Sequence, residues 1–198
     1  MNTLFSQGVI VGGEVTLKTN FFNLPGEQHV GGIWKHRELT NLNFNLSPPG
    51  QYPESPVPQF ATLGDSYTIY AGFDQYFQVY SSDSDKGWGM FARASISDGN
   101  PTPVQFFLSA GIGGYSPLAS RSNDQFGIGW YYVGASNQFG PLPQGLLGIR
   151  DGSGIEMFYN IQVNPWMNLT PDFQIVNPEA ARIANTSYIG GVRLNVKF

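Results

Sequence analysis

The sequence contains no cysteine among its 198 residues. This absence excludes disulfide bonds, thiol catalysis and cysteine-ligated zinc. No run of roughly 18 or more apolar residues occurs, so the sequence predicts no transmembrane helix. Charged residues make up only 12% of the chain, about half their usual share in globular proteins. Because the net charge is -4 and Lys and Arg do not cluster, we expect no nucleic acid partner.

The beginning of the chain and its histidines give two further absences. Residues 1–7 show no basic segment followed by an apolar one, so no signal peptide is visible. An outer-membrane protein needs such a peptide, so for that class we expect the chain to be a mature or truncated piece. His29 and His36 have no ligand partners at metal-binding spacing, and no Ser/His/Asp set is recognisable. We therefore predict no metal, no cofactor and no enzymatic activity.

The sequence is rich in aromatic residues, at 15%, and in glycine, with 25 residues. Its clearest pattern is the alternation of apolar and polar side chains in the final segment, 187–198. Successive side chains of a strand point to opposite faces, so this alternation predicts an amphipathic last strand ending on the aromatic Phe198. A membrane β-barrel often ends in this way, and the last strand of a soluble sandwich is the alternative.

The same alternation recurs along the chain. It predicts strands at residues 8–21, 29–38, 67–80, 88–97, 104–114, 126–134, 155–163 and 169–176. Turns are expected at 23–26, 81–87, 98–101 and 164–166, and long loops at 40–66 and 137–152. Short turns at one end and long loops at the other are typical of a transmembrane barrel, although segment 117–125 falls on the short side and is longer than a tight turn. The predicted fold is therefore an all-β antiparallel transmembrane β-barrel.

Several motifs then show a family resemblance. They are K-G-W-G-M-F-A-R at 86–93, D-G-N-P-T-P-V at 98–104, S-N-D-Q-F-G-I-G-W-Y-Y at 122–132, L-T-P-D-F-Q at 169–174 and G-G-V-R-L-N-V-K-F at 190–198. As an ordered set they resemble the C-terminal half of carbohydrate-selective porins of the OprB family. The resemblance implies a barrel of about sixteen strands in the bacterial outer membrane. It also implies passive diffusion of sugars and other small solutes, contact with outer-membrane lipid, and assembly as a homotrimer.

With the last segment included, the alternation predicts about nine strands, and this odd number has a consequence for the organisation of the chain. An odd number of strands cannot close a fully antiparallel ring, and two open edges in lipid would leave unpaired backbone groups. We therefore expect residues 1–198 to be one domain that forms the C-terminal portion of a larger barrel, and assembly of several chains is the alternative. Within it we expect a first strand pair at 1–38, a long loop at 39–66 and a seven-strand part at 67–198.

Polar residues on the less apolar strand faces are the candidate functional residues. The predicted pore-lining residues are Arg93, Glu156, Arg193, Asp74, Tyr131 and Phe158. Charged groups there would bind sugar hydroxyls and aromatic rings would stack on sugar faces, whereas the structural alternative is that they brace the wall. Trp34, Trp88, Trp130 and Trp166 are expected in interfacial belts, with core packing as their alternative. A soluble secreted β-sandwich that binds carbohydrate is the alternative function.

Overall fold

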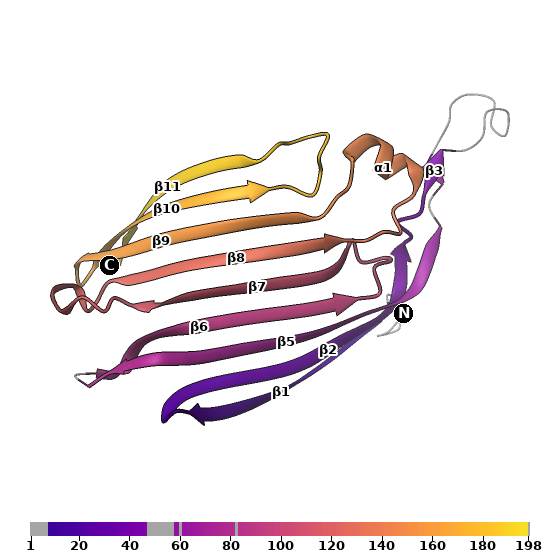
Figure 1. Ribbon diagram of the computed structural model, residues 1–198. Helices are drawn as coiled ribbons and strands as arrows, with labels where there is room; N and C mark the ends of the chain where they lie inside the picture. Colours follow the sequence, from indigo (N-terminus) through magenta and orange to yellow (C-terminus); the bar gives the residue numbers. More distant parts are fainter. Residues whose placement is uncertain (1–7, 47–57, 60, 82, 198) are drawn as a thin grey trace.

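The computed structural model describes residues 8–46, 58–59, 61–81 and 83–197. Nine long strands form one antiparallel sheet in the order β1-β2-β5-β6-β7-β8-β9-β10-β11 (Figure 1). Their bounds are β1 Val9–Phe21, β2 Leu24–Thr40, β5 Thr62–Tyr80, β6 Asp83–Ser97, β7 Val104–Tyr115, β8 Gln125–Ala135, β9 Gly152–Asn164, β10 Met167–Asn177 and β11 Ser187–Val196. The prediction of an all-β antiparallel fold is confirmed.

The first hairpin shows where the sequence-based turn was wrong. The expected turn at 23–26 is instead a two-residue turn at Phe22 and Asn23, whose φ angles are 56° and 60°. Positive φ at both central residues is the type I′ geometry, which matches the twist of paired strands. Pro25 therefore lies inside β2, where it is tolerated because the pairing of β2 with β5 begins only at Gly26.

The long connections contain short elements that the alternation does not show. Helix α1 (Pro141–Leu147) interrupts the predicted loop 137–152, η1 (Ala119–Arg121) lies in segment 117–125, and β3 (Asn45–Leu46) pairs with β4 (Pro58–Gln59). Helix α1 begins with proline and is capped at its C-terminus by Gly148, where φ is 60° and the N–H donates to the Gln144 carbonyl at 2.9 Å. Both are ordinary helix-end signals. Residues 47–57 of the predicted loop 40–66 lie outside the described part of the chain.

The strands extend further than the alternation predicts. The loop predicted at 40–66 is narrower, because β2 continues to Thr40 and β5 begins at Thr62. Likewise, β6 begins at Asp83, inside the turn predicted at 81–87. Polar and glycine-containing strand ends carry no apolar alternation, yet their backbone groups still pair with the neighbouring strand.

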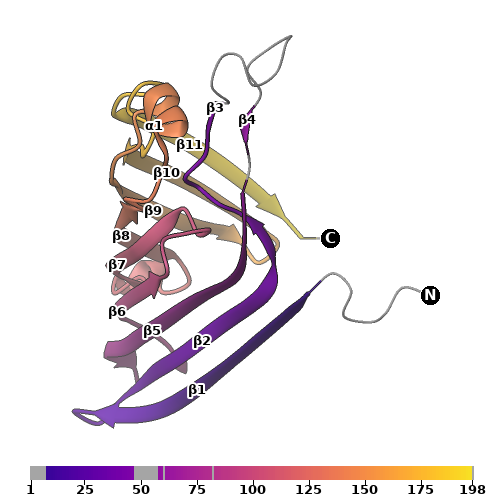
Figure 2. The same ribbon diagram turned by 90° about the vertical axis from the view of Figure 1, so that its right-hand side faces the viewer.

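The sheet is strongly curved, with β1 and β11 at its two edges (Figure 2). The longer connections and the beginning of β1 lie at one end, and the short turns lie at the other (Figure 1). Since all neighbouring strands are antiparallel, β1 and β11 run in the same direction. Among the described residues, β1 and β11 do not pair with each other, so the sheet is not closed.

The sheet is a single layer. None of the hydrophobic side chains in the described residues is buried, and large apolar side chains are exposed along most strands. A soluble sandwich would instead bury one face of this sheet against a second sheet. No helix within the described ranges is long and apolar enough to cross a membrane.

Candidate functional site

Strand register divides the sheet into two chemically different faces. Laterally paired residues share a face, so each row of pairs can be followed across the strands. One row, which defines the apolar face, contains Val15, Val30, Ala71, Ala94, Leu108 and Tyr132. A row on the opposite face, which we name the polar face, contains Lys18, Glu27, Asp74, Phe91, Gly111, Gly129, Glu156 and Gln174.

The predicted pore-lining residues all lie on the polar face, in neighbouring rows of paired residues. Arg93 and Tyr131 share one row, and Asp74 and Glu156 share the next. Phe158 lies in the row after that of Glu156, nearer the short turns, and pairs with Asp172 of β10. At about 4.8 Å per strand, Arg93 lies about 10 Å from the strand of Tyr131, and Asp74 about 19 Å from that of Glu156. They form a belt across the sheet and not one cluster.

Arg193 of β11 completes this belt. It pairs with Thr170, and its strand neighbour Gly191 pairs with Asp172 in the row of Phe158. The Asp172 carboxylate lies against Gly191, where a Cβ would fall 2.6 Å from Oδ1. Glycine therefore leaves the room that this carboxylate occupies on the polar face.

Asp74 and Arg93 form the best-defined polar contact of the belt. Arg93 Nη2 donates to both Asp74 carboxylate oxygens, at 2.9 and 2.7 Å, and Nη1 donates to the Phe73 and Ala92 carbonyls. Their side chains are 36% and 40% exposed, so the pair contributes only about 0–1 kcal/mol to stability. Its main effect is to fix the orientation of Asp74. The guanidinium also lies 6.0 Å from the centroid of the Phe91 ring.

A second polar contact connects β5 with β1 across β2. The Tyr70 hydroxyl donates to Glu14 Oε2 at 2.9 Å. Its ring crosses over Gly31, where a Cβ would fall 2.5 Å from the hydroxyl oxygen. The sequence pattern did not indicate this partner, because the two residues are 56 positions apart.

Aromatic rings of the polar face lie over glycines of the neighbouring strand. An added Cβ would fall 2.6 Å from the Phe91 ring at Gly111 and 2.5 Å from the Tyr131 ring at Gly154. At Gly127 it would meet the Phe158 ring, with Cζ at 2.8 Å. These glycines therefore let the rings lie against the wall of the sheet. The sequence pattern did not indicate this role for the glycines.

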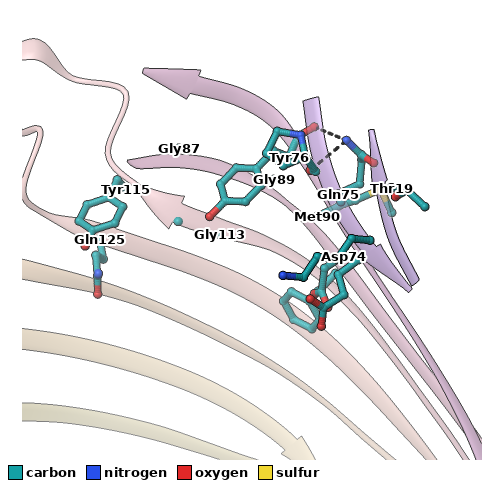
Figure 3. A pocket seen from close by; sticks show the side chains of 16 residues that line it. Thr19, Asp74, Gln75, Tyr76, Gly87, Gly89, Met90, Gly113, Tyr115 and Gln125 are labelled. Atoms are coloured by element: carbon teal, nitrogen blue, oxygen red, sulfur yellow. Dashed lines mark hydrogen bonds between the residues drawn. The ribbon is translucent and has the colours of Figure 1, made fainter. Parts of the chain in front are cut away.

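A hollow of about 670 Å³ opens on the polar face near the short turns. Its lining comes from six consecutive strands, β1, β2, β5, β6, β7 and β8, so this face is concave there. Asp74, Tyr76, Tyr115 and Gln125 surround it (Figure 3). The Phe91 ring also lines it, and Gly89 and Gly113 beside that ring carry no side chain. The sequence did not indicate this hollow.

The apolar face carries an aromatic group toward each end. Trp88 contacts Phe77 and Phe126, with ring centroids 5.5 and 6.4 Å apart, near the short turns. Tyr132 contacts Phe106 and Trp130, at 5.7 and 6.3 Å, toward the long connections. Trp34 lies on the same face in the row of Val11 and Tyr67, and Trp166 lies in the β9–β10 turn. The core-packing alternative does not hold for Trp34, Trp130 or Trp166, since each is more than two-fifths exposed.

The alternation of the predicted strand 67–80 fails at its end. Continued from Asp74 it would place Gln78 on the polar face, but a β-bulge between Tyr76 and Gln78 shifts the end of β5 by one residue. Gln78 consequently pairs with Trp88, whose indole N–H donates to its side-chain oxygen at 3.0 Å. No group of three or more His, Cys, Asp and Glu in the described ranges is arranged to hold a metal ion.

Comparison with known proteins places this two-faced sheet in context. The structure is similar to the high-pH structure of Pseudomonas putida OprB, with a TM-score of 0.78, 16% identity and 97% of this chain covered. The low-pH structure of that protein matches with a TM-score of 0.61, 17% identity and 96% of this chain covered. These likenesses show a shared fold, and the chain covers 49% and 47% of the two structures.

Sequence comparisons extend the structural likeness. An uncharacterized protein of Synechocystis sp. is 30% identical over an alignment of length 158, and the match covers 70% of this chain and 27% of that protein. The chain therefore spans about a quarter to a half of the length of these relatives. The family model described as "Carbohydrate-selective porin, OprB family" matches residues 1–198. The family predicted from the sequence motifs is confirmed: the chain belongs to the OprB family of carbohydrate-selective porins.

Proposed function

We propose that this chain forms about half the wall of a bacterial outer-membrane channel through which sugars and small hydrophilic solutes diffuse passively. The observation that carries the proposal is a curved, single-layer sheet with one apolar and one polar face. In a membrane, the apolar face contacts lipid and the polar face lines water. The two aromatic groups of the apolar face, around Tyr132 and Trp88, lie beside Phe106 and Gly114 of β7. This separation of about 27 Å along strands tilted by about 40° spans about 20 Å across the membrane, which is comparable with the roughly 25 Å apolar band of such barrels.

The direction of the edge strands indicates how the wall is completed. Because β1 and β11 run in the same direction, an odd number of further strands is needed for a ring that is antiparallel throughout. Seven further strands would give the total of about sixteen that the sequence resemblance implies. Two copies of this sheet joined β1 to β11 would instead create parallel pairs at both junctions. This argument favours further strands of the same polypeptide over assembly from several short chains.

The belt residues would act on solutes by position and charge, without covalent chemistry. Arg93, Asp74, Glu156 and Arg193 would present charged groups to passing solutes, and Tyr131 and Phe158 would offer ring surfaces to sugars. OprB-family porins are transport channels, which supports the absence of catalysis. We also propose that the short turns face the periplasm and that the natural protein is a homotrimer, which chemical cross-linking in outer membranes would test.

Solute flux measures this function directly. Liposomes containing the natural protein should swell in isotonic sugar, and planar bilayers should show stable ion-conducting channels. Arg93→Ala should shift the ratio of cation to anion permeability toward cations, because it removes a positive charge and leaves Asp74 without its partner. The outward-facing substitution Phe173→Leu should leave this ratio unchanged. Correctly folded protein that conducts neither sugars nor ions would rule out the proposed function.

A further inference from the structure

We propose that a groove on the apolar face of the sheet, across β1, β2 and β5, binds one phospholipid with a zwitterionic phosphoethanolamine head group. This inference rests on the membrane position proposed above and does not depend on which solutes pass through the channel. The groove has a volume of about 540 Å³. On the apolar face it is lined by Val11, Gly13, Gly32, Trp34, Tyr67 and Ile69.

A pair of glycines forms the floor of the groove. Gly13 of β1 pairs with Gly32 of β2, and Gly32 pairs with Ile69 of β5. A Cβ added at Gly13 would meet nothing within 4 Å, and one added at Gly32 would contact only the Thr68 carbonyl oxygen, at 3.5 Å. The floor is therefore open space on the face that contacts lipid. The three strands together are about 10 Å wide, so a single lipid molecule reaches all of them.

Two aromatic side chains stand at the end of the groove nearer the long connections. Trp34 and Tyr67 pair with each other in the row next to that of the glycines. Among the described residues, neither the Trp34 indole N–H nor the Tyr67 hydroxyl has a hydrogen-bond partner. At a membrane boundary, such rings place their apolar part in the hydrocarbon and their polar atom at its edge. Both groups can therefore donate to the ester or phosphate oxygens of a lipid whose acyl chain lies over the glycines.

Charged side chains occupy the next row. His36 pairs with Asp65, its Nδ1 lies 2.9 Å from Asp65 Oδ1, and its ring stacks on Trp34 with centroids 5.5 Å apart. Four residues of β2 separate His36 from Gly32, which is about 13 Å along the strand, or about 10 Å across the membrane at a tilt of about 40°. This distance is sufficient to pass from a head-group layer roughly 5–8 Å thick into the acyl chains. The order of chemistry along the groove therefore follows that of a lipid molecule.

The charges of this row favour a zwitterionic head group over an anionic one. Asp65 Oδ2 bonds to no residue in the described part of the chain, so it can accept the ammonium group of ethanolamine. A second carboxylate lies beside the groove, since Asp98 Oδ2 accepts the Tyr67 N–H at 3.2 Å. The described residues that form these three rows of the apolar face include no Lys or Arg. A lipid that carries phosphate but no ammonium would meet two carboxylates there and no permanent cation.

Lipid binding to the natural protein in mild detergent tests the groove. Native mass spectrometry counts the lipids bound during titration with phosphatidylethanolamine, and with phosphatidylglycerol of the same acyl chains. The unmodified protein should bind one phosphatidylethanolamine more tightly than phosphatidylglycerol and more tightly than any further lipid. In Gly32→Leu, the concentration that half-saturates this first site should rise about fivefold, because the leucine side chain fills the groove. Gly190→Leu is the control and should not change it, since Gly190 also lies on the apolar face with nothing within 4 Å of an added Cβ.

Asp65→Asn tests the head group separately. This exposed substitution should leave the acyl-chain groove intact and remove the preference for phosphatidylethanolamine over phosphatidylglycerol. A circular dichroism spectrum equal to that of the unmodified protein shows that each variant is folded.

Three results would refute the lipid site. They are unmodified affinity in folded Gly32→Leu, a preference of the unmodified protein for phosphatidylglycerol, and tighter retention of lipopolysaccharide than of phosphatidylethanolamine. A change in the number of protein chains per complex in Gly32→Leu would show that a second copy occupies the groove, and would also refute it. Channel conductance is measured separately in planar bilayers. A protein that binds the lipid but forms no channel would therefore contradict the proposed function and not this site.

Discussion

Replacing Gly127 with alanine should displace the Phe158 ring from the wall of the sheet. The added methyl group would occupy space filled by the ring, whose Cζ lies 2.8 Å from the position of that Cβ. Forcing an added methyl group into occupied space usually lowers the free energy of unfolding by about 1–3 kcal/mol. Because the conflicting atoms belong to a rotatable side chain and not to the backbone, we expect the lower part of this range, about 1–2 kcal/mol.

Gly13→Ala is the matched control. Gly13 also lies in mid-strand, but on the apolar face, and an added Cβ would meet nothing within 4 Å. Both substitutions restrict the backbone of the unfolded chain to the same extent, so that contribution cancels in the comparison. Urea unfolding of the natural protein in lipid vesicles, followed by tryptophan fluorescence, should therefore show Gly127→Ala as the less stable variant.

A double-mutant cycle shows whether the ring is responsible. In a Phe158→Ala background, the methyl group at position 127 no longer meets a ring, so Gly127→Ala should have almost no effect. Equal stability of Gly127→Ala and Gly13→Ala would refute the account of the polar-face glycines. An undiminished effect in the Phe158→Ala background would refute the role of the ring.

Three further substitutions test other parts of the structure by the same unfolding assay. Val15→Lys, on the apolar face at a side chain that is 70% exposed, should destabilise the membrane-bound protein by about 2–4 kcal/mol, whereas Thr16→Lys on the polar face should be nearly neutral. Phe22→Gly should stabilise it by about 1 kcal/mol by relieving a positive φ at a side chain that is 94% exposed, and a loss of stability would show that this ring has a contact elsewhere. Asp124→Ala should lower stability by about 1–3 kcal/mol, because this buried carboxylate accepts the Gln162 N–H at 2.8 Å, whereas Asp85→Ala in an exposed turn should have little effect.

Strand alternation predicted the fold and the faces because both depend on local periodicity. A period of two places Arg93, Glu156 and Phe158 on the same face wherever the strands begin and end. Strand ends were missed where polar or glycine-containing segments, such as the start of β5 at Thr62, pair through the backbone alone. Helix α1 was missed because its seven residues are too short to show a helical period.

Contacts across strands were beyond prediction because they depend on register. The Asp74–Arg93 ion pair and the Tyr70–Glu14 hydrogen bond join residues 19 and 56 positions apart. Turn lengths and bulges set these alignments, and a shift of one residue reverses every side chain of a strand. The bulge beside Gln78 did so locally. The hollow depends on six aligned strands at once, so no single segment of the sequence indicates it.

The accessibility of strand β7 in outer membranes tests the central claim most directly. The natural chain contains no cysteine within these 198 residues, so single cysteines can be introduced here without a background of native thiols. A membrane-impermeant thiol reagent should label Phe107→Cys and Ser109→Cys on the polar face. It should not label Leu108→Cys, Ala110→Cys or Ile112→Cys on the apolar face. Labelling at every position, or alternation of the opposite phase, would contradict a wall with water on the polar face and lipid on the apolar face.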